Sequence, residues 1–179
     1  MFSFDLCLKT LLIATSLLTG WSFGGVVAFE SARKLLSMGY PVKGVVLIDS
    51  PCPLDHVPLS DSIVDFALNL NAWHPNSEIG ELVRMQIQKS SQMLAQHNHC
   101  PSDGPYPKLA LLHSREAFDP PGIESVPGWL KDRDLVSAAN RWKELVGTAI
   151  KVWEIPGNHF QTFHACNVCT SRPCPSYLD

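Results

Sequence analysis

The chain has 179 residues, of which 45% are hydrophobic and 17% are charged, and its formal net charge is −3 at pH 7. This length and composition suit one globular domain with a sizeable core. The absence of a basic patch argues against a nucleic-acid-binding protein. Six cysteines without the spacing of a disulfide framework favour reduced thiols and a cytoplasmic location.

The N-terminal part contains an uncharged stretch of membrane-spanning length, residues 10–29. Three glycines and several hydroxyl side chains make it only moderately apolar, and its second half belongs to the elements described next. No small-residue cleavage site precedes a mature domain. We therefore predict neither a membrane span nor a secretory signal, and we separate residues 1–15 as an atypical N-terminal segment.

A strand, a helix and a second strand follow one another between residues 16 and 48. The short apolar run at 16–19 predicts a buried strand, and residues 25–40 space their apolar side chains as a helix does. Gly39 and Pro41 end this helix. Residues 42–48 are almost continuously apolar and predict a second buried strand. Together these segments form a βαβ unit.

The turn between the first strand and the helix contains the sequence Gly-Trp-Ser-Phe-Gly at residues 20–24. In the G-x-S-x-G pattern, glycines allow a sharp strand-to-helix turn that holds the serine in a strained conformation and exposes its hydroxyl. The pattern predicts Ser22 as a nucleophile. The alternative is a glycine-rich turn in an ordinary α/β protein.

A serine hydroxyl needs a neighbouring base, and the chain has seven histidines. His159 follows a predicted strand at 149–155 and a Pro-Gly-Asn turn, which is where α/β-hydrolases place their base. His113 follows an apolar run and is expected to be a core or strand-end residue. The others are expected to be solvated surface residues or part of the C-terminal tail: His56, His74, His97, His99 and His164.

Three carboxylates are candidates for the acid that orients this histidine. Asp49 ends the second strand, at the same edge of the sheet as Ser22. Glu116 and Asp119 follow a further predicted strand at 108–113. The order of elements alone leaves the three open, and each of them could also be a solvated turn residue.

Three segments resemble the thioesterase domain that ends fungal non-reducing polyketide synthases, a member of the α/β-hydrolase superfamily. They are Gly-Trp-Ser-Phe-Gly-Gly at 20–25, Leu-Ile-Asp-Ser-Pro-Cys-Pro at 47–53 and Gly-Asn-His-Phe at 157–160. The resemblance covers residues 17–165 in order. It implies Ser22 as nucleophile, Asp49 as acid and His159 as base. The backbone N–H of Phe23 follows the nucleophile and is the expected oxyanion donor.

The resemblance also implies a reaction. The serine would take a polyketide chain from the phosphopantetheine thioester of an acyl carrier protein or domain, and water or an internal nucleophile would then release it. Hydrolysis, lactonisation and carbon–carbon ring closure are the outcomes of this family. No cofactor of its own is expected. The alternative is a catalytically inactive remnant that binds at most a carrier protein or a hydrophobic ligand.

We therefore predict an α/β fold of the α/β-hydrolase type, with a mostly parallel sheet, flanking helices and a helical lid. The domain is assigned to residues 16–165 and the lid to about 54–107, with predicted helices at 60–71 and 77–97. Nineteen residues before Gly20 are too few for the first strands of this family and for the loop that gives a second oxyanion donor. We expect those strands to be missing.

The last residues, 166–179, form a tail rich in cysteine and proline. His164, Cys166, Cys169 and Cys174 have the spacing H-x-C-x₂-C-x₄-C, which could bind zinc. Structural zinc sites usually pair two knuckles across a longer loop, whereas these four residues lie close together beside two prolines. We predict an unstructured tail with free thiols and no metal site.

Overall fold

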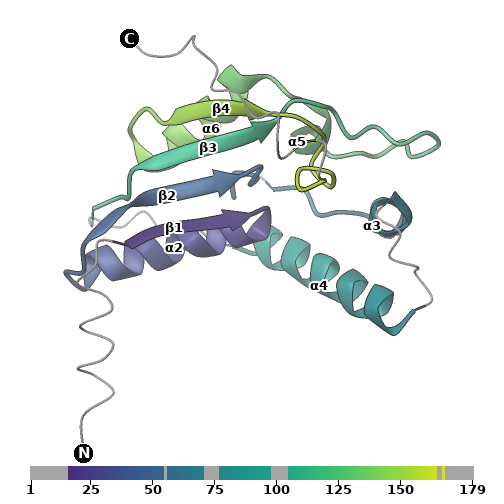
Figure 1. Ribbon diagram of the computed structural model, residues 1–179, viewed down its shortest axis with the longest axis horizontal. Coiled ribbons are helices and arrows are strands. Elements are labelled where there is room, and N and C mark those ends of the chain that lie inside the picture. The colour runs from purple at the N-terminus through teal and green to yellow at the C-terminus, as the bar shows by residue number, and fades with distance from the viewer. Residues whose placement is uncertain (1–15, 55, 71–76, 98–104, 165–166, 168–179) are drawn as a thin grey trace, which may run out of the picture.

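A four-stranded parallel sheet is the centre of the computed structural model, which describes residues 16–54, 56–70, 77–97, 105–164 and 167. Its strands lie side by side in chain order (Figure 1): β1 (Ser16–Trp21), β2 (Val42–Ile48), β3 (Leu109–Ser114) and β4 (Lys151–Ile155). Each neighbouring pair is parallel. All four carboxyl ends therefore meet at one edge of the sheet, and the predicted α/β fold is confirmed.

Five helices are described: α2 (Phe23–Ser37), α3 (Asp61–Leu70), α4 (Glu78–Ala95), α5 (Gly128–Lys131) and α6 (Leu135–Val146). The first three lie where apolar periodicity predicts helices. The sequence analysis did not predict α5 and α6. No helix among the described residues is long and apolar enough to span a membrane. Part of the uncharged stretch at 10–29 instead forms β1 and the start of α2.

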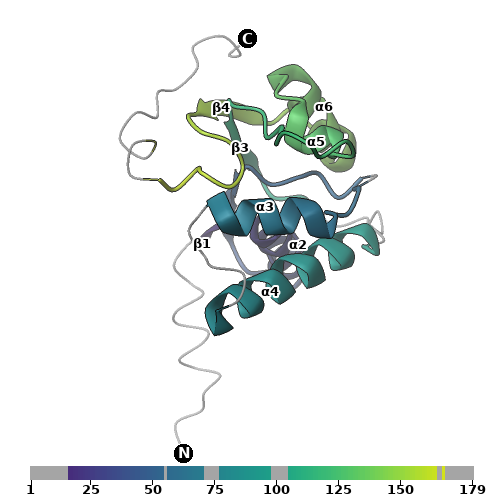
Figure 2. The same cartoon turned by 90° about the vertical axis from the view of Figure 1, so that its right-hand side faces the viewer.

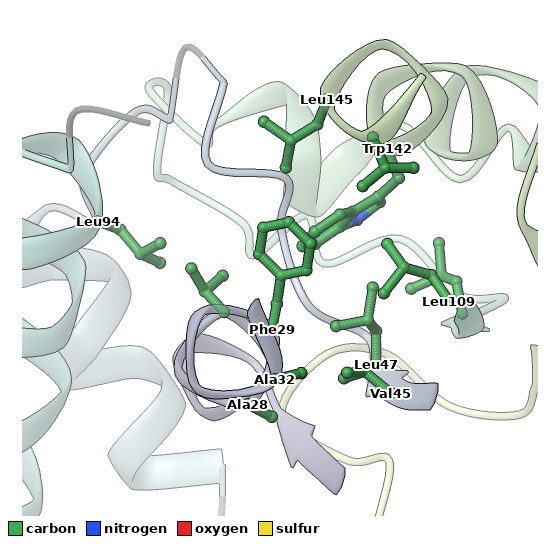
Figure 3. Packing of buried hydrophobic residues seen from close by; sticks show 12 residues of the cluster. Ala28, Phe29, Ala32, Val45, Leu47, Leu94, Leu109, Trp142 and Leu145 are labelled. Atoms are coloured by element: carbon green, nitrogen blue, oxygen red, sulfur yellow. The ribbon is translucent and has the colours of Figure 1, made fainter. Parts of the chain in front are cut away.

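The main core lies between the sheet and the helices α2 and α6. Phe29 of α2 is fully buried and meets Trp142 of α6 edge-on, with 5.6 Å between ring centroids. Leu47 and Leu111 of the two central strands are also buried in this cluster. Figure 3 shows how these side chains converge from both helices onto the strands. This packing fixes the sheet from which the site residues project.

A second buried cluster lies beyond the carboxyl edge of the sheet. It joins α3 to the segments that follow β3 and β4, and its buried members are Ile63, Ala67, Phe118, Leu130 and Phe160. Both α3 and α4 lie beyond the carboxyl ends of the strands, as the two views show (Figures 1 and 2). The cluster therefore anchors the segment around Phe160 above the strand ends.

Candidate active site

The turn between β1 and α2 is a strained elbow. Ser22 has φ 53° and ψ −127°, a backbone conformation that residues other than glycine rarely adopt. A Cβ at Gly20 would lie 2.1 Å from the carbonyl oxygen of Gly24, and a Cβ at Gly25 would lie 1.8 Å from Ser50 Oγ. Gly24 itself has open space around its Cβ position. The close approaches therefore require glycine at 20 and 25.

The structure brings Ser22, His159 and Asp49 into one chain of hydrogen bonds. His159 Nε2 lies 3.0 Å from Ser22 Oγ, and His159 Nδ1 lies 2.8 Å from Asp49 Oδ2. His159 and Asp49 are only 1% and 3% exposed. In this arrangement an imidazole can take a proton from a serine hydroxyl while a carboxylate holds its tautomer.

Aromatic rings enclose the imidazole of His159. Trp21 stacks on it at 5.2 Å between centroids and donates its indole N–H to the carbonyl oxygen of His159 at 3.2 Å. Trp129 and Phe160 meet the ring edge-on at 5.1 and 4.9 Å. These contacts restrict the ring to the orientation in which Nε2 faces Ser22. Sequence reasoning did not single out Trp129, which comes from α5.

Asp49 is held by more donors than His159 alone. Ser114 donates its N–H to Oδ1 at 2.8 Å and its hydroxyl to Oδ2 at 2.6 Å. His113 Nδ1 lies 3.1 Å from Oδ1, and Arg133 Nη1 lies 3.0 and 3.2 Å from the two oxygens. Burial raises the pKa of Asp49, but hydrogen bonds from His113 and His159 and the charges of His159 and Arg133 outweigh it. The pKa of Asp49 is therefore held well below its usual 3.8, and the carboxylate is charged.

A cavity of about 270 Å³ opens at Ser22. Most of its walls are apolar or aromatic, and they come from the elbow, from α4 and from the segments around Trp129 and His159: Trp21, Phe23, Ile87, Leu94, Trp129 and Phe160. As the first residue of α2, Phe23 has no carbonyl within its own helix for its N–H to bond. That N–H stands at the start of α2, directly after Ser22 in the chain.

His56 was expected to be a solvated surface residue, and that expectation is wrong. It lines the cavity at Ser22 and also a neighbouring cavity of about 360 Å³. Its ring lies 5.3 Å from that of Trp129, and neither ring nitrogen has a hydrogen-bond partner among the residues that the structure describes. Burial, with a smaller effect of the charge of His159, lowers the pKa of His56 from 6.5 to about 4. His56 is thus neutral at physiological pH.

Among the described residues, the other candidates for acid and base do not bond to Ser22 or His159. Glu116 Oε1 accepts the N–H of Gly157 at 3.2 Å, and Asp119 pairs with Lys131 at 3.0 Å. His113 is buried at the end of β3, as predicted. His97 is half-buried and lies 3.2 Å from Glu30, so it is not the free surface residue that was expected. Five of the residues considered above lie outside the described part of the chain: His74, His99 and the three tail cysteines. Among the described residues, no cluster of potential metal ligands occurs.

Several known proteins are similar to this chain in sequence. Residues 13–65 match the family model described as Thioesterase domain. Over 148 residues the chain is 43% identical to orsellinic acid synthase armB of Armillaria mellea, covering 80% of this chain and 7% of that protein. Over 185 residues it is 38% identical to orsellinic acid synthase of Beauveria bassiana, covering 85% of this chain and 8% of that protein. The chain thus spans less than a tenth of the length of these two relatives.

Solved structures of thioesterase domains share the fold of this chain. The NocB thioesterase domain of the nocardicin cluster matches with a TM-score of 0.64 and 26% identity, over 90% of this chain and 63% of that chain. The surfactin thioesterase domain SrfTE, at 23% identity, shares the fold with a TM-score of 0.57, over 92% of this chain and 67% of that chain. Sequence and fold together identify the chain as a thioesterase-family domain homologous to a segment of fungal non-reducing polyketide synthases.

Proposed function

We propose that this chain is a serine thioesterase that releases a polyketide or related acyl chain from a carrier-protein thioester. The observation that carries the proposal is the hydrogen-bond chain from Ser22 through His159 to Asp49, at the mouth of an apolar cavity. The relatives named above, which are orsellinic acid synthases, support a polyketide as the acyl group.

The reaction would begin with attack of Ser22 Oγ on the thioester carbonyl carbon, while His159 Nε2 takes the hydroxyl proton. The backbone N–H of Phe23 would face the carbonyl oxygen as it becomes negative. The carbon–sulfur bond then breaks, and His159 returns the proton to the leaving sulfur as a thiol. An acyl-serine remains.

The second half repeats these roles with a different nucleophile. His159 takes a proton from water, or from a hydroxyl or carbon nucleophile of the acyl chain itself, as that group attacks the ester. The Ser22–acyl bond breaks and His159 returns the proton to Ser22. Asp49 keeps the imidazole oriented and stabilises its charged form in both halves. Hydrolysis and cyclisation therefore use the same three side chains.

The substrate would be presented by an acyl carrier protein or domain through its phosphopantetheine arm, and the thioesterase itself needs no cofactor. We assign the role of a lid to α3 and α4, because α4 supplies Ile87 and Leu94 to the wall of the cavity at Ser22. An apolar wall beside the elbow suits an acyl chain, since it excludes water from the acyl-serine.

A fluorophosphonate probe tests the proposal, because it phosphonylates only a serine with an adjacent base. We expect one label on Ser22, no label on Ser22→Ala, and strongly reduced labelling of His159→Ala. Hydrolysis of an N-acetylcysteamine thioester should follow the same order. Folded wild-type protein that takes no label at any pH would instead identify a catalytically inactive remnant that at most binds a carrier protein or hydrophobic ligand.

A further inference from the structure

Arg133 lies between α5 and α6 and is almost completely buried, with its side chain only 8% exposed. All five of its N–H groups have acceptors. Nε donates to the carbonyl oxygen of Leu130 at 3.2 Å, and Nη2 donates to the carbonyl oxygens of Trp129 and Leu130 at 2.9 and 2.8 Å. Nη1 donates to Asp49 and to Ser114 Oγ at 3.0 Å. The guanidinium thus joins the α5 segment to the buried carboxylate.

Among the described residues, Asp49 is the only carboxylate that Arg133 contacts. Their charges offset each other within a pair whose side chains are only 8% and 2% exposed. The imidazole that must become positive during the proposed reaction is hydrogen-bonded to Oδ2 of that same carboxylate, and Arg133 contacts both of its oxygens. An uncompensated Asp49 would stabilise the imidazolium of His159 more strongly than one that shares its charge with a cation.

We propose that Arg133 is a positioning residue for the Ser22–His159–Asp49 site, with two effects. It offsets the charge of Asp49, which would otherwise stabilise the imidazolium of His159 more strongly. It also binds the backbone at 129 and 130, which fixes the Trp129 ring against His159 and in the cavity wall. This inference rests on the proposed function.

Other ionisable groups around the site do not supply this effect. His113 from β3 and His56 from the segment after β2 are the titratable neighbours of Asp49 and His159. Asp132 and Asp134 line the neighbouring cavity together with Asp49, and Arg141 lines it too. The basic side chains near the site are His56, His113, Arg133 and Arg141. Among them, only Arg133 is both bonded to Asp49 and permanently charged. Its removal is therefore expected to change the pH dependence in a way that loss of another cation does not.

The test measures the rate of fluorophosphonate labelling of Ser22 between pH 5 and 9. In Arg133→Gln, which keeps a hydrogen-bond donor but loses the charge, the midpoint of the acid limb should move up by about one pH unit. Labelling at a fixed pH on that limb should then be about tenfold slower, and the plateau rate should be recovered at high pH. Arg133→Lys should keep a midpoint close to that of the wild type.

The matched control is Lys131→Gln, which also removes one positive charge. Lys131 lies two residues before Arg133, and its exposed side chain is paired with Asp119. Its midpoint should stay at the wild-type value. The second effect is read from KM for an acyl N-acetylcysteamine thioester: Arg133→Lys should raise KM about tenfold, because an ammonium cannot bind Asp49 and both backbone carbonyls in the same fork.

Two results would overturn the inference. One is an unchanged midpoint in folded Arg133→Gln, and the other is an Arg133→Lys profile displaced upward at an unchanged KM. If Arg133→Gln does not fold, Arg133→Lys still tests the charge effect, because lysine keeps the positive charge. A shifted midpoint of the acid limb in that variant would exclude the charge effect. If Ser22 of the wild-type chain is never labelled, the result counts against the proposed function. If labelling depends on His159 but not on Arg133, the result counts only against this inference.

Discussion

Trp129 meets the imidazole of His159 edge-on, with 5.1 Å between ring centroids, although the two residues come from different elements. The ring of Trp129 also forms part of the cavity wall at Ser22, and its indole N–H donates to the carbonyl oxygen of Val57 at 3.2 Å. One side chain therefore contacts the proposed base, lines the cavity at Ser22 and binds the segment that leads to α3.

Trp129→Ala should lower kcat/KM for an acyl N-acetylcysteamine thioester by about fivefold, since an aromatic pair contributes about 1 kcal/mol beyond its buried area. Trp129→Phe should keep most of the activity, because it retains an aromatic ring at this position. Steady-state hydrolysis by both variants checks this. Equal losses in the two variants would show that the indole N–H, and not the ring, is what matters.

Asp49→Asn should reduce turnover by about 10⁴, because an amide that donates to His159 Nδ1 favours the wrong tautomer. The amide nitrogen would also face donors from Ser114 and Arg133, so the free energy of unfolding should fall by about 1–3 kcal/mol. Turnover and urea denaturation measure the two effects. Glu116→Gln is the control and should remain active; if it loses activity and Asp49→Asn does not, the assignment of the acid is wrong.

The two neighbouring glycines of α2 should respond differently to alanine. Gly25→Ala should lower the free energy of unfolding by about 1–3 kcal/mol, because its Cβ would overlap the buried Ser50 Oγ. Gly24→Ala should change it by less than about 1 kcal/mol, since its Cβ position is open. Chemical denaturation of both variants tests the elbow packing. Similar destabilisation of the two would contradict it.

His56 should make the stability of the domain depend on pH. The folded protein keeps His56 neutral down to about pH 4, whereas the unfolded chain binds the proton near pH 6.5. Between these values the unfolded state binds more protons, so the free energy of unfolding falls as the pH drops from 6.5 towards 4. Because His56 is partly exposed, we expect the loss to be about 1–2 kcal/mol.

Urea denaturation at pH 7 and at pH 5 measures this loss. In His56→Gln the part of the pH dependence due to His56 should disappear. An identical slope in wild type and His56→Gln would mean that His56 is accessible to protons in the folded protein.

Local sequence patterns predicted much of this domain. The βαβ unit and the helices α3 and α4 follow from apolar spacing, and Ser22 is marked by its flanking glycines. His159 follows from its position after a late strand. Sequence spacing could not choose among Asp49, Glu116 and Asp119, because all three follow strands at the same edge, and only the resemblance favoured Asp49. The structure places Asp49 against His159.

No local sequence pattern predicts that Trp129, Arg133 and His56 lie at the site. Each depends on how segments distant in sequence close over the sheet, so an isolated tryptophan, arginine or histidine in a polar stretch gives no warning. The helix α6 did carry a signal that was not used. Asp134 caps its start by accepting the N–H of Ser137 at 2.8 Å, and Gly147 ends it with φ 72°.

The order of the described strands places Ser22 and His159 at opposite margins of the sheet, since Ser22 follows β1 and His159 follows β4. Three strand spacings separate those margins, about 14 Å, and the backbone after β4 must bridge that gap before Nε2 can reach the hydroxyl. No pair of neighbouring strands can assemble the couple by itself. Under the proposed mechanism, Ser22 can react only after all four described strands have aligned in their correct order.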